Sequence, residues 1–176
     1  LFEFLDELSS RRRDEFNHEH MGKFQDMLIQ LYAQFEPPKL HDFLEYSSHY
    51  SLQKALKACQ DHTPDPLYKE MVFILGRMGG AKNARPALAI ILEKLRNVSL
   101  GIQFVEKKGL EEYWGDLVSR CIQDPNLVGD LLESAGAFSV NPAQIVQRLD
   151  ENMNIPNLGD RLVKLFDDIR LQRRLR

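Results

Sequence analysis

The sequence from residue 67 to residue 78 reads Leu-Tyr-Lys-Glu-Met-Val-Phe-Ile-Leu-Gly-Arg-Met. Its apolar side chains would surround most of a helix and leave a narrow polar strip, made of Lys69, Glu70, Gly76 and Arg77. A helix that is apolar nearly all round packs against neighbours on two or more sides. The segment therefore predicts an inner helix in a stack of helices.

Other segments show one apolar stripe at helical spacing. Residues 88–95, 127–132, 145–153 and 158–169 each place their large apolar side chains three or four positions apart. No sustained alternation of apolar and polar residues indicates a strand, and no Asn-Gly or Asp-Gly pair indicates a hairpin turn. We therefore expect an all-α protein with about ten or eleven helices.

The residues that could start helices also recur at a regular spacing. The prolines that could open helices are Pro37, Pro66, Pro125 and Pro156. The first and last of the three gaps are each about 30 residues, which is the length of one helical hairpin in an α-solenoid. The middle gap is close to twice as long, and a cap-like Asn97-Val98-Ser99 stands near the missing position.

This spacing predicts one α-solenoid of antiparallel helical hairpins over residues 1–176, which we interpret as a fragment of a longer protein. A closed helical bundle remains the alternative. The tetratricopeptide repeat fits less well, because its period is longer and its tryptophan pattern is missing. Gly79 and Gly80 are expected to end a helix, and the segments 9–13 and 80–86 to form loops.

Composition excludes several classes of function. The 176 residues hold 23 basic and 26 acidic side chains, for a net charge of −3. A nucleic-acid-binding domain usually shows a basic excess or a basic face, so we predict no nucleic-acid partner. No apolar run approaches the roughly 20 residues that cross a bilayer, so no transmembrane segment is predicted.

The candidate chemical groups do not assemble into a reactive site. His18 and His20 are two positions apart and would point about 200° apart on a helix, so we interpret them as part of a solvated loop. Cys59 and Cys121 lie in line with apolar residues and are predicted to be buried free thiols. We expect no catalytic residues, no metal and no cofactor, and therefore no enzyme.

A resemblance to a known family begins at residues 68–79 and continues through residues 88–95, 102–106, 114–117 and 155–158. Together these segments resemble the clathrin heavy-chain repeat region of the vacuolar protein sorting subunit forty-one family. The resemblance covers residues 1–176 and is strongest over residues 67–165. The matching signature positions, which we interpret as structural, are Gly76, Arg77, Gly79, Trp114 and Pro156. For Arg77 we expect either an ion pair with Glu70 or a contact with a backbone carbonyl.

The resemblance implies a role and not a reaction. It implies a non-enzymatic segment of the HOPS tethering complex, which acts before membrane fusion in transport from late endosomes to vacuoles or lysosomes. It also implies other tethering subunits as partners, self-association through the repeats, and indirect links to a Rab GTPase, SNAREs and an adaptor complex. The implied place is cytoplasmic, peripheral on late endosomal, vacuolar and lysosomal membranes. The alternative is an unrelated helical-repeat adaptor that binds peptides or proteins.

Overall fold

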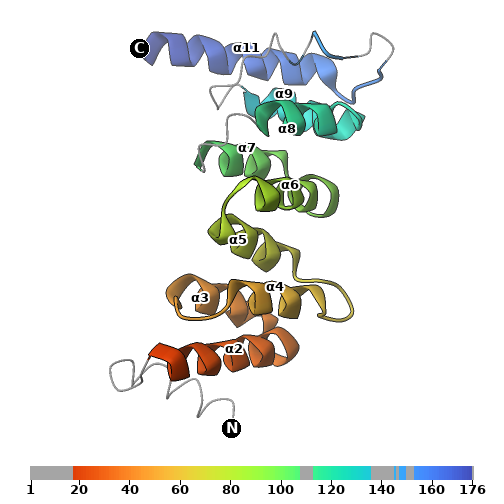
Figure 1. Ribbon diagram of the computed structural model, residues 1–176. Coiled ribbons are helices and arrows are strands. Elements are labelled where there is room, and N and C mark those ends of the chain that lie inside the picture. The colour runs from red at the N-terminus through yellow and green to blue at the C-terminus, as the bar shows by residue number, and fades with distance from the viewer. Residues whose placement is uncertain (1–17, 108–112, 136–144, 146, 150–152, 176) are drawn as a thin grey trace. The chain divides into compact units, whose positions relative to one another are not determined.

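A computed structural model describes residues 18–107, 113–135, 145, 147–149 and 153–175 (Figure 1). These residues form helices and turns, with no strand among them, which confirms the all-α prediction. The chain divides into two compact units, unit 1 (Leu1–Ala87) and unit 2 (Leu88–Arg176). None of the described helices is long and apolar enough to cross a bilayer.

Unit 1 consists of stacked helical hairpins. Its helices are α2 (His18–Phe35), α3 (Pro37–Tyr46), α4 (Leu52–Gln60) and α5 (Tyr68–Met78), and α6 (Ala81–Ala89) follows. Helix α2 packs against α3 and α4, and α5 packs against α4 and α3 (Figure 1). Helix α2 therefore contacts both the next helix and the next but one, and α5 contacts both helices before it. The side chains at the centre of this stack are fully buried, among them Leu28, Leu40, Leu44 and Ile74.

Unit 2 repeats the same arrangement. It contains a short π-helix, η1 (Ile90–Lys94), followed by α7 (Val98–Lys107), α8 (Trp114–Cys121), α9 (Pro125–Ala135) and α11 (Leu158–Leu175). Helix α7 packs against η1, α8 and α9, and α9 packs against α8 and α11. The core is again aliphatic, and its fully buried side chains include Ile91, Leu92, Ile102, Leu117, Leu131 and Leu132.

The helix starts confirm the solenoid and its predicted period. Helices α3, α5, α7, α9 and α11 begin at Pro37, Tyr68, Val98, Pro125 and Leu158. Each start follows the one before it by roughly 30 residues, the length of one helical hairpin. The start that was missing from the proline pattern is α7, where the Asn97 side-chain oxygen accepts the Leu100 N–H at 2.9 Å. Every interval is shorter than the period of the tetratricopeptide repeat, which is about 34 residues.

Two of the four prolines do not open a helix, and there the prediction was wrong. Pro66 lies in a loop that folds back on α4, because the Leu67 N–H binds the Cys59 carbonyl at 3.0 Å. Pro156 lies in a turn with Asn157, whose φ of 54° is a left-handed conformation that asparagine tolerates. The helices begin two residues after each proline, at Tyr68 and Leu158.

Two predicted loops also need correction. Most of the segment 80–86 belongs to α6, with Pro86 inside the helix. Its alanines favour a helix, and Ala84 and Ala87 are buried, so packing outweighs the cost of the proline. The His18–His20 segment begins α2 and is helical. The segment 9–13 lies outside the described residues.

The predicted helix end at Gly79 and Gly80 is confirmed. The two glycines have φ angles of 65° and 73°, a region that residues with a Cβ rarely adopt. The Gly79 N–H still binds the Leu75 carbonyl at 3.2 Å, so the chain leaves α5 immediately after its last turn. The glycines therefore terminate the apolar helix and redirect the chain into α6.

Candidate functional site

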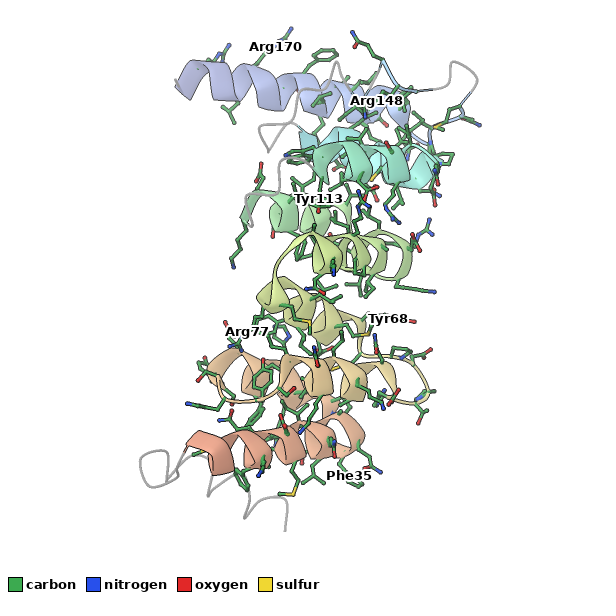
Figure 2. The ribbon with its side chains drawn as sticks, viewed as in Figure 1. Phe35, Tyr68, Arg77, Tyr113, Arg148 and Arg170 are labelled. Carbon is green, nitrogen blue, oxygen red and sulfur yellow. The ribbon has the colours of Figure 1, made fainter. Side chains whose placement is uncertain are left out.

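The Arg77 guanidinium at the end of α5 makes three hydrogen bonds within unit 1. Its Nη1 atom donates to the Leu44 carbonyl at 2.9 Å, to the Ser47 carbonyl at 2.9 Å and to the Tyr50 hydroxyl at 2.8 Å. These carbonyls belong to the last turn of α3 and to the residue that caps it. The carbonyls at the end of a helix have no partner within that helix. Arg77 therefore caps α3 from the following hairpin (Figure 2).

Tyr50 completes this cap. Its hydroxyl donates to the Leu44 carbonyl at 3.2 Å, and its ring centroid lies 5.2 Å from the guanidinium carbon of Arg77. Burial raises the pKa of the Tyr50 hydroxyl, and the nearby Arg77 charge opposes that rise. The hydroxyl is therefore neutral at physiological pH and serves as a hydrogen-bond donor.

A second link in unit 1 joins α2 to the start of α4. The Asp26 carboxylate accepts the Ser51 N–H at 2.7 Å and binds the Lys54 ammonium at 2.8 Å. Beside it, the Gln25 side-chain oxygen accepts the His49 N–H at 2.9 Å. A Cβ atom at Gly22 would lie 2.8 Å from the His49 carbonyl oxygen, so only glycine permits this close approach. The Asp26 side chain of α2 thus caps the N-terminus of α4, the second helix after α2.

Unit 2 joins its helices through ion pairs. The Arg161 guanidinium of α11 lies 2.8 Å from the Asp130 carboxylate of α9, and Lys164 pairs with Glu133 one turn further along. A Cβ atom at Gly129 would lie 2.5 Å from Arg161 Nη1, so the guanidinium crosses α9 at a residue without a side chain. Arg161 also lies 3.8 Å from Glu133, and further pairs among the described residues of this unit join Arg120 with Glu93 and Arg96 with Asp124.

The links of both units span about one repeat in sequence. Asp26 and Lys54 are 28 residues apart, Arg77 and Ser47 are 30, and Arg161 and Asp130 are 31. These intervals match the spacing of the helix starts. Within each unit, these links fix the position of a hairpin relative to the hairpin before it.

The two thiols are inert. Cys59 and Cys121 are fully buried and free, as the sequence predicts. Burial, and to a smaller extent the nearby carboxylates, raises the pKa of each thiol to about 12. Because the thiolate is the nucleophile and the metal ligand, neither cysteine is reactive at physiological pH. No group of three potential ligands among the residues described here is placed to hold a metal ion.

Comparison with known proteins identifies the family of this solenoid. The family model that matches the chain is described as the Vps41 TPR-like region, and it covers residues 1–147. The chain belongs to the Vps41 family. The family description is TPR-like, and the comparison with clathrin heavy-chain repeats stays a prediction.

Proteins of the Vps41 family from distant organisms resemble the chain over most of its length. The vacuolar protein sorting-associated protein 41 homologue of Solanum lycopersicum is 41% identical over 158 residues, which is 89% of this chain and 16% of the relative. The homologues of Danio rerio and Homo sapiens are 41% and 38% identical over 160 residues, which is 91% of this chain and 18% of each relative. The chain therefore spans less than a fifth of the curated relatives it matches. No solved structure matches the chain.

Four of the five predicted signature positions of the Vps41 family lie at helix ends or inside helices. Gly76 is buried within α5, Gly79 ends that helix, and the half-buried Trp114 is the first residue of α8. Pro156 is exposed in the turn before α11. Their assignment as structural positions stays a prediction. Of the two contacts expected for Arg77, the carbonyl contact is present.

Sequence reasoning missed the charged residues that join successive repeats. Asp130 and Glu133 are three residues apart on α9, and their partners Arg161 and Lys164 are three residues apart on α11. A search for opposite charges separated by one repeat would have found both pairs.

Proposed function

We propose that this chain is a scaffold segment, without enzymatic activity, of a HOPS-type tethering complex in vacuolar protein sorting. The observation that carries the proposal is the match to the Vps41 TPR-like region over residues 1–147. The relatives named above are vacuolar protein sorting-associated proteins. The segment would act in transport from late endosomes to vacuoles or lysosomes, at the stage that precedes membrane fusion.

The mechanism that we propose is passive and rests on the links between repeats. A solenoid is held together by contacts between neighbouring repeats, so each hairpin depends on the next. Here those contacts include directional hydrogen bonds, such as Arg77 to the Leu44 and Ser47 carbonyls. Bonds of this kind oppose sliding of one hairpin over another. The segment would thereby serve as a spacer of defined geometry and as a docking surface.

The partners that we propose are other subunits of the tethering complex and further copies of the chain. Links to a Rab GTPase, to SNAREs and to an adaptor complex would be indirect. The proposed location is the cytoplasmic side of late endosomal, vacuolar and lysosomal membranes, held there through partners.

A chimera tests this proposal. The aligned segment of the human homologue is replaced by this chain, and the chimera is expressed in human cells that lack the homologue. We expect delivery of cargo to lysosomes to recover and the other tethering subunits to co-purify with the chimera. The matched control carries a designed helical-repeat array of equal length in place of the chain.

Two results would contradict the proposal. A chimera that is expressed normally but neither restores delivery nor co-purifies the other subunits would exclude a tethering role for the chain. Full recovery with the designed array would leave the chain without a docking function of its own.

A further inference from the structure

An open groove of about 590 Å³ lies between α2 and α4 in unit 1. This volume is within the range of known ligand sites, which is about 300–1,000 Å³. Ala33 of α2 and Ala58 of α4 both line it, and each contributes only a methyl group. The groove therefore exists because two helices in contact carry small residues at this position.

Two side-chain amides lie along one side of the groove. Gln30 and Gln34 are exposed and one helical turn apart, a rise of about 6 Å. The backbone of an extended peptide presents the same groups every second residue, or about every 6.7 Å. Each amide offers both a donor and an acceptor. Neither amide hydrogen-bonds to another residue that the structure describes, so both are available to a ligand.

The other side of the groove carries charge. Lys54 binds Asp26 at 2.8 Å and is therefore neutralised. Lys57 is exposed, and no carboxylate in the described part of the chain lies within 4.0 Å of its ammonium. Asp61 follows one turn later at the end of α4, and it is likewise without an ion-pair partner among the described residues. An anion is therefore favoured beside Lys57 and disfavoured beside Asp61.

We propose that this groove binds an extended peptide segment with an acidic side chain opposite Lys57. Gln30 and Gln34 hold the peptide backbone, and the distance from Lys54 to Asp61, about 10 Å along α4, accommodates about three extended residues. Lys57, the unpaired cation among the described residues that line the groove, selects one carboxylate, and Asp61 fixes the direction of the peptide. A nucleic acid is disfavoured because its successive phosphates would meet Asp61. The inference is independent of the proposed tethering role.

Peptide selection on the 176-residue chain tests the proposal. A phage library of fully randomised octapeptides is selected on the immobilised chain, and the enriched peptides are synthesised with a fluorescent label. Their affinity is then measured by fluorescence anisotropy at low and at high NaCl concentration, about 0.05 M and about 0.5 M, which brackets the range over which salt screens exposed charges. We expect the enriched peptides to share an Asp or Glu and to bind more weakly at the higher salt concentration.

Variants then assign the contacts. We expect Lys57→Glu to weaken binding about tenfold and the double change Gln30→Ala with Gln34→Ala to weaken it about fivefold, whereas Asp61→Asn strengthens it about twofold. Lys69→Glu makes the same charge reversal on α5, outside the groove, and is expected to leave binding unchanged. Urea unfolding of each variant shows whether the fold is kept, and Lys57→Gln replaces Lys57→Glu if the latter unfolds.

Three results would overturn the proposal. The first is that the enriched peptides share no acidic residue. The second is that acidic peptides bind the Lys57 variant and the parent chain with the same affinity. The third is that no peptide from the library binds more tightly than millimolar. Because selection uses the chain alone, its failure would leave the chimera experiment unaffected, and failure of the chimera would leave the groove intact.

Discussion

The two units join their hairpins at the same sequence spacing but with different chemistry. In unit 1 a charged side chain binds backbone groups at a helix end, as Arg77 does at the end of α3 and Asp26 at the start of α4. In unit 2 side chains of opposite charge pair with each other, as the half-buried Arg161 does with the more exposed Asp130. Loss of a backbone cap removes the charged partner of groups at a helix end, whereas loss of an ion pair that is open to solvent on at least one side costs little. We therefore expect removal of one link to lower the free energy of unfolding more in unit 1 than in unit 2.

The largest effect is expected from Arg77→Met. The change leaves two carbonyls and the Tyr50 hydroxyl without their charged donor, and it should lower the free energy of unfolding by about 2–3 kcal/mol. Urea unfolding measures the loss, and hydrogen exchange should localise it to α3 and α5. Arg85→Met removes an exposed arginine of the same unit and is the control. Equal losses for both variants would contradict the capping role.

A smaller effect is expected from Asp26→Ala. This change removes the acceptor of the Ser51 N–H and the partner of Lys54, and we expect a loss of about 1–2 kcal/mol. Asp26→Asn keeps an oxygen for the Ser51 N–H but removes the charge. If the backbone cap dominates, thermal unfolding should show that Asp26→Asn loses less than half of the stability that Asp26→Ala loses. If Asp26→Asn lowers the stability as much as Asp26→Ala does, the charge and not the backbone cap provides this link, as in the ion pairs of unit 2.

Gly129→Ala tests the crossing of Arg161 over α9. The new methyl group would displace the guanidinium from Asp130, while alanine favours the helix over glycine by up to about 1 kcal/mol. We expect these effects to offset each other in the parent chain. In an Arg161→Met background, the same change should stabilise the chain by about 1 kcal/mol. A double-mutant cycle measured by urea unfolding would contradict the crossing if Gly129→Ala had the same effect in both backgrounds.

The smallest effect is expected from Glu133→Gln, and it depends on pH. The hydrogen bond from Lys164 lowers the pKa of Glu133 from its ordinary value of 4.5. A carboxyl group whose pKa is lower in the folded state contributes stability above its unfolded pKa, and the contribution disappears as the pH falls through the folded pKa. We expect a loss of about 0.3 kcal/mol at about pH 7 that vanishes in acid, once the pH has fallen below the folded pKa, and in about 1 M NaCl. A loss that is independent of pH and salt would contradict an electrostatic link.

The sequence predicts the helices well because their apolar stripes determine which faces are buried. The inner helix of residues 67–78, the glycines that end it and the two buried thiols all follow from local patterns. The hairpin period follows from helix caps, even where a proline is missing at Asn97. These features depend on neighbouring residues in the sequence, so they can be deduced without the structure.

The errors arise where packing overrides local preference. Pro86 is accepted inside α6 because Ala84 and Ala87 are buried beside it. Pro66 lies outside α5 because the preceding loop folds back on α4. The groove was also missed, since the proximity of Ala33 to Ala58 depends on how α2 and α4 pack. Local patterns predict which face of a helix is buried, but not which residue of the next repeat it meets.

The short span of the links has a consequence for synthesis of the chain. The bonds described here that join one hairpin to the next close over 24 to 33 residues. A ribosome adds about 5–20 residues per second, so the partner of each linking side chain follows within seconds. Helices pack together far faster than that. Each hairpin can therefore settle on its predecessor while translation continues, and no hairpin has to wait for the completed protein.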